Sequence, residues 1–220
     1  MKNLLQTRIC RSEQFSFYSH LGGVIFGLFV LVVLVFKTWG MWDLLIVCTI
    51  YGLSLITLFA ASSAYHAFKV TESSAMIWRK LDHIAIFIMI AGSYTPIAYI
   101  YLDGAWPWVI ITSQWIIVAC GILFKFYFIH APRIVSPILY LLMGWMALIP
   151  MPVIWRTIPL YSLILLAAGG VSYSIGAVIY AIKKPNPKHG FFGFHEIFHI
   201  FVLLGAVLHF LVVYLGIHPK

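Results

Sequence analysis

The sequence predicts an all-α integral membrane protein, a bundle of seven transmembrane helices. Of its 220 residues, 63% are hydrophobic and only 9% are charged, whereas a soluble domain is closer to half apolar and a quarter charged. A bilayer core of roughly 30 Å takes about 20 apolar residues as a helix, and seven stretches reach that length. Because these runs are continuously apolar and do not alternate, helices are favoured over barrel strands.

The seven apolar stretches follow one another with short connections, which predicts one membrane domain over residues 1–220. The polar segment MKNLLQTRICRSEQ precedes the first stretch, which is long for a signal-peptide core and lacks a small-residue cleavage site. We therefore expect this first helix to be retained. The expected helices cover residues 18–37, 43–66, 82–102, 106–128, 134–154, 160–182 and 194–216.

Basic residues in the connections predict the orientation of the bundle. Eleven of the 14 Lys and Arg residues fall on one side of the expected helices. The positive-inside rule then predicts a cytoplasmic N-terminus and a C-terminus outside. The net charge of +8 is explained by this topology, so we do not expect nucleic-acid binding. The eleven are Lys2, Arg8, Arg11, Lys69, Arg79, Lys80, Lys125, Arg133, Lys183, Lys184 and Lys188, and the other three are Lys37, Arg156 and Lys220.

Three histidines and one aspartate from separate helices are predicted at similar depth near the cytoplasmic side. The second helix ends in SSAYH with His66, the third opens with Asp82, and the seventh opens with His195 and His199. Residues four apart share a helix face, so the pair on the seventh helix can point at one ion. Three neutral imidazoles are a common zinc set that leaves the fourth tetrahedral position open.

We therefore expect His66, His195 and His199 to hold Zn²⁺, with Asp82 orienting a water or a ligand imidazole. Ionisable residues inside membrane helices are costly and usually functional. A single membrane histidine is more often an interhelical hydrogen-bond donor, and this interpretation is kept for the remaining histidines. His20, at the cytoplasmic end of the first helix, is the rival ligand.

The segment HEIFH, residues 195–199, also matches the H-E-x-x-H signature of zinc metalloproteases. Intramembrane zinc proteases pair that signature with an aspartate in an L-D-G motif, and residues 102–104 read Leu-Asp-Gly. Asp103, however, is expected in the outside turn, a membrane thickness of roughly 30 Å from His195. The protease hypothesis is therefore rejected. Glu196, beside a predicted ligand, could still act as a general base or be a polar residue at the helix entrance.

These motifs resemble the progestin and adipoQ receptor family, in its bacterial hemolysin III branch. S-x-x-x-H, the aspartate and H-x-x-x-H occur in order over essentially the whole chain, and KLDHIAIFIMIAGSYTP and HIFVLLGAVLHF are similar to that family's third and seventh helices. The resemblance implies a multi-pass protein of the bacterial inner (plasma) membrane. It also implies zinc near the cytoplasmic leaflet on His66, His195 and His199, with Asp82 acting through a water and Ser62 supporting the site.

Two functions remain open at this stage. A zinc-dependent hydrolase would use Asp82 to hold a water or act as general base against a lipid amide or ester, and the resemblance implies a ceramide-like lipid. Alternatively, zinc is structural, and the resemblance then implies a membrane-homeostasis or fluidity sensor or a pore-forming cytolytic protein. A fourth protein ligand would favour the second reading. Membrane lipids are the expected partners. The oligomeric state stays open, because Gly23 and Gly27 could pack helices within or between chains.

Overall fold

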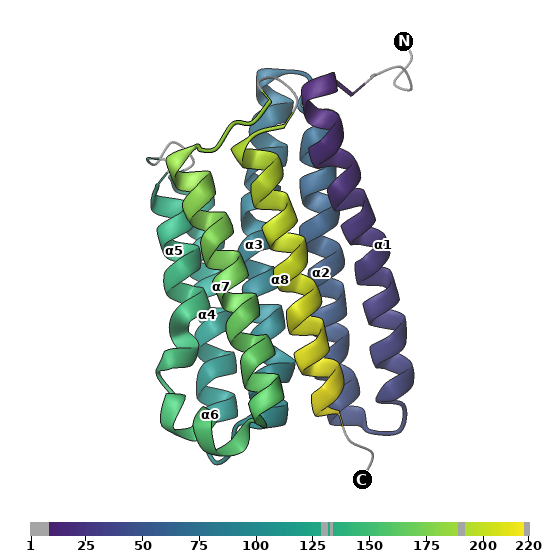
Figure 1. Cartoon of the computed structure of the whole chain (residues 1–220), viewed down its shortest axis with the longest axis vertical. Coiled ribbons are helices and arrows are strands. Elements are labelled where there is room, and N and C mark those ends of the chain that lie inside the picture. The colour runs from purple at the N-terminus through teal and green to yellow at the C-terminus, as the bar shows by residue number, and fades with distance from the viewer. Residues whose placement is uncertain (1–8, 129–131, 133, 189–191, 218–220) are drawn as a thin grey trace.

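The computed structural model describes residues 9–128, 132, 134–188 and 192–217. It is an elongated bundle whose helices run up and down, so that α1 begins and α8 ends at opposite ends (Figure 1). In chain order the helices are η1 (Arg11–Glu13), α1 (Gln14–Lys37), α2 (Trp42–Phe68), α3 (Glu72–Tyr101), α4 (Trp106–Tyr127), α5 (Val135–Gly144), η2 (Trp145–Leu148), α6 (Met151–Thr157), α7 (Leu160–Ile182) and α8 (Phe194–Gly216).

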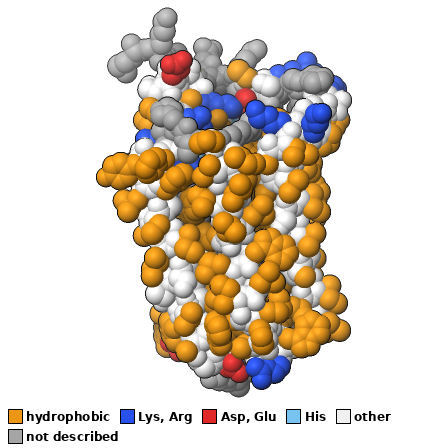
Figure 2. Space-filling view, turned by 90° about the vertical axis from the view of Figure 1, so that its left-hand side faces the viewer, with side chains coloured by type: hydrophobic (Ala, Val, Ile, Leu, Met, Phe, Trp, Pro, Cys, Tyr) orange, Lys and Arg blue, Asp and Glu red, His pale blue; other side chains and the backbone are white. Residues whose placement is uncertain are grey.

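Six helices of the described part are long and apolar enough to cross a membrane, and a bent pair makes a seventh if it is one span. The six are α1 with η1, α2, α3, α4, α7 and α8. The predicted all-α membrane bundle is confirmed. On the face in Figure 2, hydrophobic side chains cover the middle of the bundle while Lys and Arg gather at its upper end.

The expected helix over residues 134–154 is not continuous. Residues Val135–Leu148 and Met151–Thr157 meet at a bend of 57°. Pro150 is the N-cap of α6 and Pro152 lies in its first turn. Proline has no N–H to donate, so the helical hydrogen bonding cannot run through this segment without a break. Hydropathy registers the apolar character of such a segment but not its direction.

Helix α3 begins ten residues earlier than expected, at Glu72. Thr71 caps it, since its Oγ1 accepts a hydrogen bond of 3.2 Å from the backbone N–H of Ser74. The first turns of the helix are polar, so hydropathy does not mark them as part of a membrane span. Asp82 therefore lies in the third turn of α3 and does not open the helix.

The basic residues divide between the two ends of the bundle as the sequence predicts. Those of the larger group that the structure describes lie at the end where α1 begins, whereas Lys37 and Arg156 lie at the other end. Lys2, Arg8, Arg133 and Lys220 fall outside the described residues.

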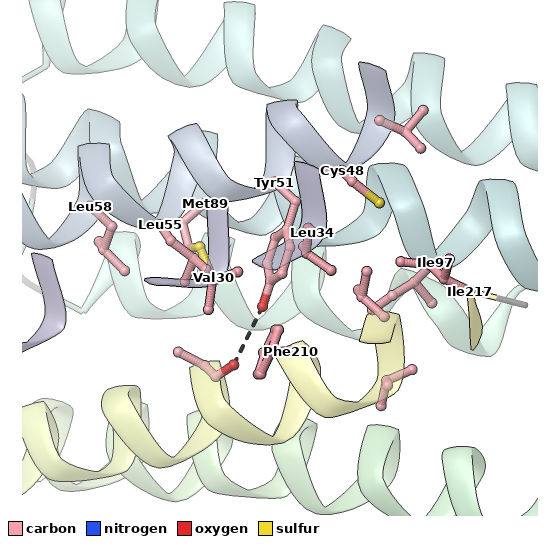
Figure 3. Close-up of a cluster of buried hydrophobic side chains, with 14 of the residues drawn as sticks. Val30, Leu34, Cys48, Tyr51, Leu55, Leu58, Met89, Ile97, Phe210 and Ile217 are labelled. Atoms are coloured by element: carbon pink, nitrogen blue, oxygen red, sulfur yellow. Dashed lines mark hydrogen bonds between the residues drawn. The ribbon is translucent and has the colours of Figure 1, made fainter. Parts of the chain in front are cut away.

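The main core lies between α1, α2, α3 and α8. Tyr51, Leu55 and Phe59 of α2 are fully buried in it, and the Tyr51 hydroxyl donates to the Ala206 carbonyl of α8 over 3.4 Å (Figure 3). Glycines on α1 allow close packing: a Cβ at Gly27 would lie 3.1 Å from the backbone nitrogen of Ile56. Gly23 and Gly27 are buried against α2 of the same chain.

Candidate metal centre

Three histidines meet at the end of the bundle where α1 begins. His66 lies in the last turn of α2, and His195 and His199 lie in the first two turns of α8. Each residue contributes one imidazole nitrogen to the cluster, and these three nitrogens lie within 4.8 Å of one another. His66 and His199 are buried, and His195 is half-buried. The predicted depth of the helix ends and the spacing of four residues on the last helix predict these three residues as one set, and the structure brings them together.

The geometry of the cluster fits a metal ion. Nε2 of His66 and Nε2 of His195 are 3.2 Å apart. Nitrogen ligands of a tetrahedral ion such as Zn²⁺, each about 2.0–2.1 Å from the metal, lie about 3.3 Å from one another. The three rings are tilted or edge-to-face to one another, with centroids 4.6 to 5.1 Å apart. His66, His195 and His199 could therefore hold a metal ion.

A carboxylate that the sequence analysis did not single out supports this cluster. Nδ1 of His66 lies 2.6 Å from Oε2 of Glu13, in η1. The same oxygen forms an ion pair of 2.6 Å with Nζ of Lys69. An ionised carboxylate only accepts hydrogen bonds, so His66 carries its proton on Nδ1 and leaves the lone pair of Nε2 for a metal. A histidine ligand held by a carboxylate in this way is typical of protein metal sites.

Asp82 and Ser62 lie beside the three histidines but outside the ligand cluster. The Ser62 hydroxyl hydrogen-bonds the Asp82 carboxylate, and that carboxylate is close enough to His66 and Lys69 to interact with both electrostatically. Asp82 is half-buried, and it lines a cavity together with Ser62. This position suits a group that orients a water molecule next to the cluster, although the role itself stays a prediction.

Glu196 has structural partners for both of its carboxylate oxygens. Oε2 accepts the backbone N–H of Gly193 over 2.9 Å, which caps the start of α8. Oε1 accepts the hydroxyl of Ser16 over 2.9 Å, which ties α1 to α8. These contacts give Glu196 a role in positioning His195, directly before it, and His199, three residues after it. Its role as a general base stays a prediction.

His20 is stacked on His199, with ring centroids 3.6 Å apart and planes 8° from parallel. It is buried, and neither of its ring nitrogens has a hydrogen-bond partner among the described residues. Its nitrogens are not part of the ligand cluster. His20, the rival ligand, therefore lies next to the cluster without belonging to it, and its ring nitrogens have no hydrogen-bond partner among the described residues.

Asp103 lies in the turn between α3 and α4, at the opposite end of the bundle from His195. Asp82 lies beside the histidine cluster, and from there α3 runs to Tyr101. That part of the helix is about 28 Å long at 1.5 Å per residue. The L-D-G segment therefore cannot complete a protease site with HEIFH, as the sequence analysis concluded.

A cavity of about 660 Å³ leads from the cluster into the bundle. Its polar end is lined by His195, His199, Asp82 and Ser62. From there it continues between α3, α5, α6, α7 and α8, where its wall is mostly aliphatic and aromatic. Sites of this volume with a few polar groups at one place are typical of small-molecule binding.

A helical membrane bundle with a three-histidine cluster at one end defines the class: a polytopic membrane protein with a candidate metal centre. The family described as haemolysin-III related matches residues 9–210. The chain belongs to this family, and the resemblance noted from its motifs is confirmed.

Individual relatives agree with this assignment. The chain is similar to hemolysin-3 of Bacillus cereus, with 28% identity over 215 residues that cover 97% of this chain and 95% of the relative. Hemolysin-3 homolog of Bacillus subtilis (strain 168) is 32% identical over 169 residues, 77% of this chain and 76% of the relative. The monocyte to macrophage differentiation factor of Homo sapiens is 27% identical over 171 residues, 73% and 66% of the two chains.

Proposed function

We propose that this protein is a zinc-dependent hydrolase that cleaves an amide or ester bond of a membrane lipid, such as a ceramide-like lipid. One observation carries the proposal: two histidines of the cluster share the wall of a largely apolar cavity with Asp82 and Ser62. An acyl chain fits the apolar part of that cavity, and the polar linkage of the lipid would then lie at the histidine end.

Each residue has a distinct part in this proposal. His66, His195 and His199 hold the ion, and Glu13 fixes the ring of His66 through Nδ1. Bound zinc would supply Lewis-acid polarisation of a carbonyl and a water of lowered pKa. Asp82 holds the attacking water, accepts its proton and returns a proton to the leaving amine or alcohol. Ser62 keeps the Asp82 carboxylate in place through its hydroxyl.

The proposal includes an orientation, with the N-terminus in the cytoplasm and the metal centre near the cytoplasmic leaflet of a bacterial plasma membrane. The gathering of basic side chains at the end where α1 begins supports it. Reporter fusions at Ile217 and in the loop after Lys37 would be active outside the cell if it holds. Activity inside the cell at both positions would reverse it.

A second function has its own supporting observation. His20, stacked on His199 with two unsatisfied nitrogens, could become a fourth ligand by a change of rotamer. A closed set of four histidines leaves no position for substrate, so the zinc would then be structural. The protein would in that case sense or adjust membrane properties, or permeabilise a membrane, as the names of its hemolysin-3 relatives suggest.

Two measurements on detergent-purified protein test the proposal: its metal content and its hydrolysis of lipids. Wild type is expected to carry about one zinc ion per chain, and His66→Ala, His195→Ala and His199→Ala are expected to lose it. His209→Ala is the matched control, because His209 is half-buried on the same helix but outside the cluster. Release of fatty acid from a panel of lipid amides and esters then separates the hydrolase from the structural alternative.

A further inference from the structure

A second polar cluster lies at the same end of the bundle, where α3, α4 and α5 meet. Lys125, in the last turn of α4, is only 3% exposed although it is a lysine. Its ammonium group donates to the hydroxyl of Ser136, at the start of α5, over 2.5 Å. Lys125, Ser136 and Arg79 of α3 all line the large cavity. None of these three residues takes part in the proposed hydrolysis.

Among the described residues, the two cations of this cluster, Lys125 and Arg79, have no negative partner. The chain has six acidic side chains, and all of them lie in the described part. The ion pairs found there join Glu13 to His66 and to Lys69, so no acidic side chain pairs with Lys125 or Arg79. The two cations are moreover close enough to repel each other. A buried charge without compensation is costly, so an anion at this place would be strongly favoured.

The surroundings also supply hydrogen bonds for such an anion. The ammonium group of Lys125 has three N–H donors. Among the described residues, the hydroxyl of Ser136 accepts one of them. The guanidinium of Arg79 offers a planar fork that suits carboxylate or phosphate oxygens. The Tyr140 hydroxyl donates a hydrogen bond to the carbonyl of His83 and is also hydrogen-bonded to the Ser136 hydroxyl. These two contacts hold this wall of the cavity together.

We infer that Lys125, Arg79 and Ser136 bind the anionic group of an acyl lipid, a carboxylate or a phosphate, whose chain lies in the apolar part of the cavity. The cavity volume of about 660 Å³ lies in the range of ligand sites and is continuous from these residues to the aliphatic lining of α7 and α8. This inference deepens the proposed function, on which it rests for the reaction: the substrate or product of the hydrolase is an anionic lipid.

Binding of defined probes to delipidated protein in a non-ionic detergent tests the inference. Oleate is compared with oleyl alcohol, and phosphatidic acid with the diacylglycerol of the same chains. Wild type is expected to bind at least one anionic probe about tenfold or more tightly than its uncharged counterpart. Whichever pair shows the preference identifies carboxylate or phosphate as the ligand. Equal binding within both pairs would overturn the inference.

Variants then locate the preference. Lys125→Met and Arg79→Gln are expected to abolish it, and Lys80→Met is the matched control. Lys80 is next to Arg79 on α3 and lies over the ring of Phe126, outside the cavity wall. An equal loss in Lys80→Met would show a general effect of surface charge and would refute the site. If Lys125→Met fails to fold, Arg79→Gln decides the question alone.

Two further readouts separate this site from its alternatives. Removing a buried unpaired cation should leave lipid-free Lys125→Met at least as stable as wild type, whereas a merely structural contact with Ser136 predicts a lower melting temperature. His66→Ala should keep the preference for the anionic probe, because Lys125 and Arg79 are unchanged. Loss of the preference in His66→Ala would place the anion at the metal centre instead.

The lipid site and the proposed hydrolase can also be told apart. If the protein hydrolyses no lipid but keeps its preference for the anionic probe, the hydrolase function is refuted and the lipid site is not.

Discussion

Glu13 and His66 are joined by a hydrogen bond of 2.6 Å between a carboxylate oxygen and Nδ1 of the imidazole. The two residues are far apart in the sequence and come from η1 and the last turn of α2. Lys69 holds the same carboxylate oxygen at 2.6 Å, so the position of Glu13 is fixed from α2 as well. The contact sets both the orientation of the His66 ring and which of its nitrogens faces His195.

Glu13→Gln should weaken metal binding by about 10- to 100-fold, the usual cost of losing a carboxylate behind a histidine ligand. The amide keeps the shape of the side chain but removes the charge that stabilises His66 and pairs with Lys69. Competition with a chelator of known affinity measures the change. Glu72→Gln, in the exposed first turn of α3, is the control with the same chemical change. Equal affinities in the two variants would leave Glu13 without a role at the metal.

The histidine cluster could be predicted from the sequence because each ligand lies at a recognisable helix end. Apolar runs place the end of α2 and the start of α8 at the same membrane face, and the spacing of four puts His195 and His199 on one side of α8. Glu13 could not be predicted in this way. It lies in a polar stretch ahead of the first apolar run, where hydropathy assigns no depth, and only the turn of η1 brings it over the end of α2.

In the fold, too, hydropathy predicts the positions of the membrane spans but not where a helix starts or bends. Long apolar runs locate the spans, because the bilayer requires them. The start of α3 at Glu72 depends on the cap at Thr71, and the bend before α6 depends on backbone donors missing at two prolines. Both are local hydrogen-bonding effects, and neither changes the average hydropathy. The unpaired state of Lys125 likewise requires knowing where all six carboxylates lie.

His20→Ala should retain about one zinc ion per chain, because the ligand cluster is complete without His20. The loss of ring stacking on His199 is expected to lower stability, since a buried ring is replaced by a methyl group. Metal analysis and thermal unfolding of the same preparation check both statements. Loss of zinc from His20→Ala, comparable with its loss from His199→Ala, would establish a fourth ligand and favour the structural alternative.

Asp82→Asn should keep the metal and lose hydrolysis. An asparagine can still accept the Ser62 hydroxyl, but it cannot take a proton from water, so the rate should fall by about 10²- to 10⁴-fold. Fatty-acid release from the lipid that wild type cleaves best measures the rate, with zinc content determined in parallel. Asp103→Asn is the matched control, because its carboxylate lies at the other end of the bundle. Full activity in Asp82→Asn would remove this residue from the mechanism.

Gly23→Ala should destabilise the protein, whereas Gly22→Ala should not. A Cβ at Gly23 would lie 2.5 Å from the Phe59 ring, while a Cβ at Gly22 meets nothing within 4 Å. Overpacking of this kind costs about 1–3 kcal/mol, and it outweighs the gain of about 1 kcal/mol that alanine brings to a helix. Thermal unfolding in detergent measures both variants.

The same pair of variants links packing to the metal centre. Helix α1, with η1 before it, carries Glu13, Ser16 and His20 to the cluster, so pushing α1 away from α2 should also lower zinc affinity. We expect chelator competition to show weaker binding in Gly23→Ala and unchanged binding in Gly22→Ala. Equal affinity in the two variants, with Gly23→Ala less stable, would mean that the cluster tolerates a displaced α1 and that α2 and α8 alone position the ligands.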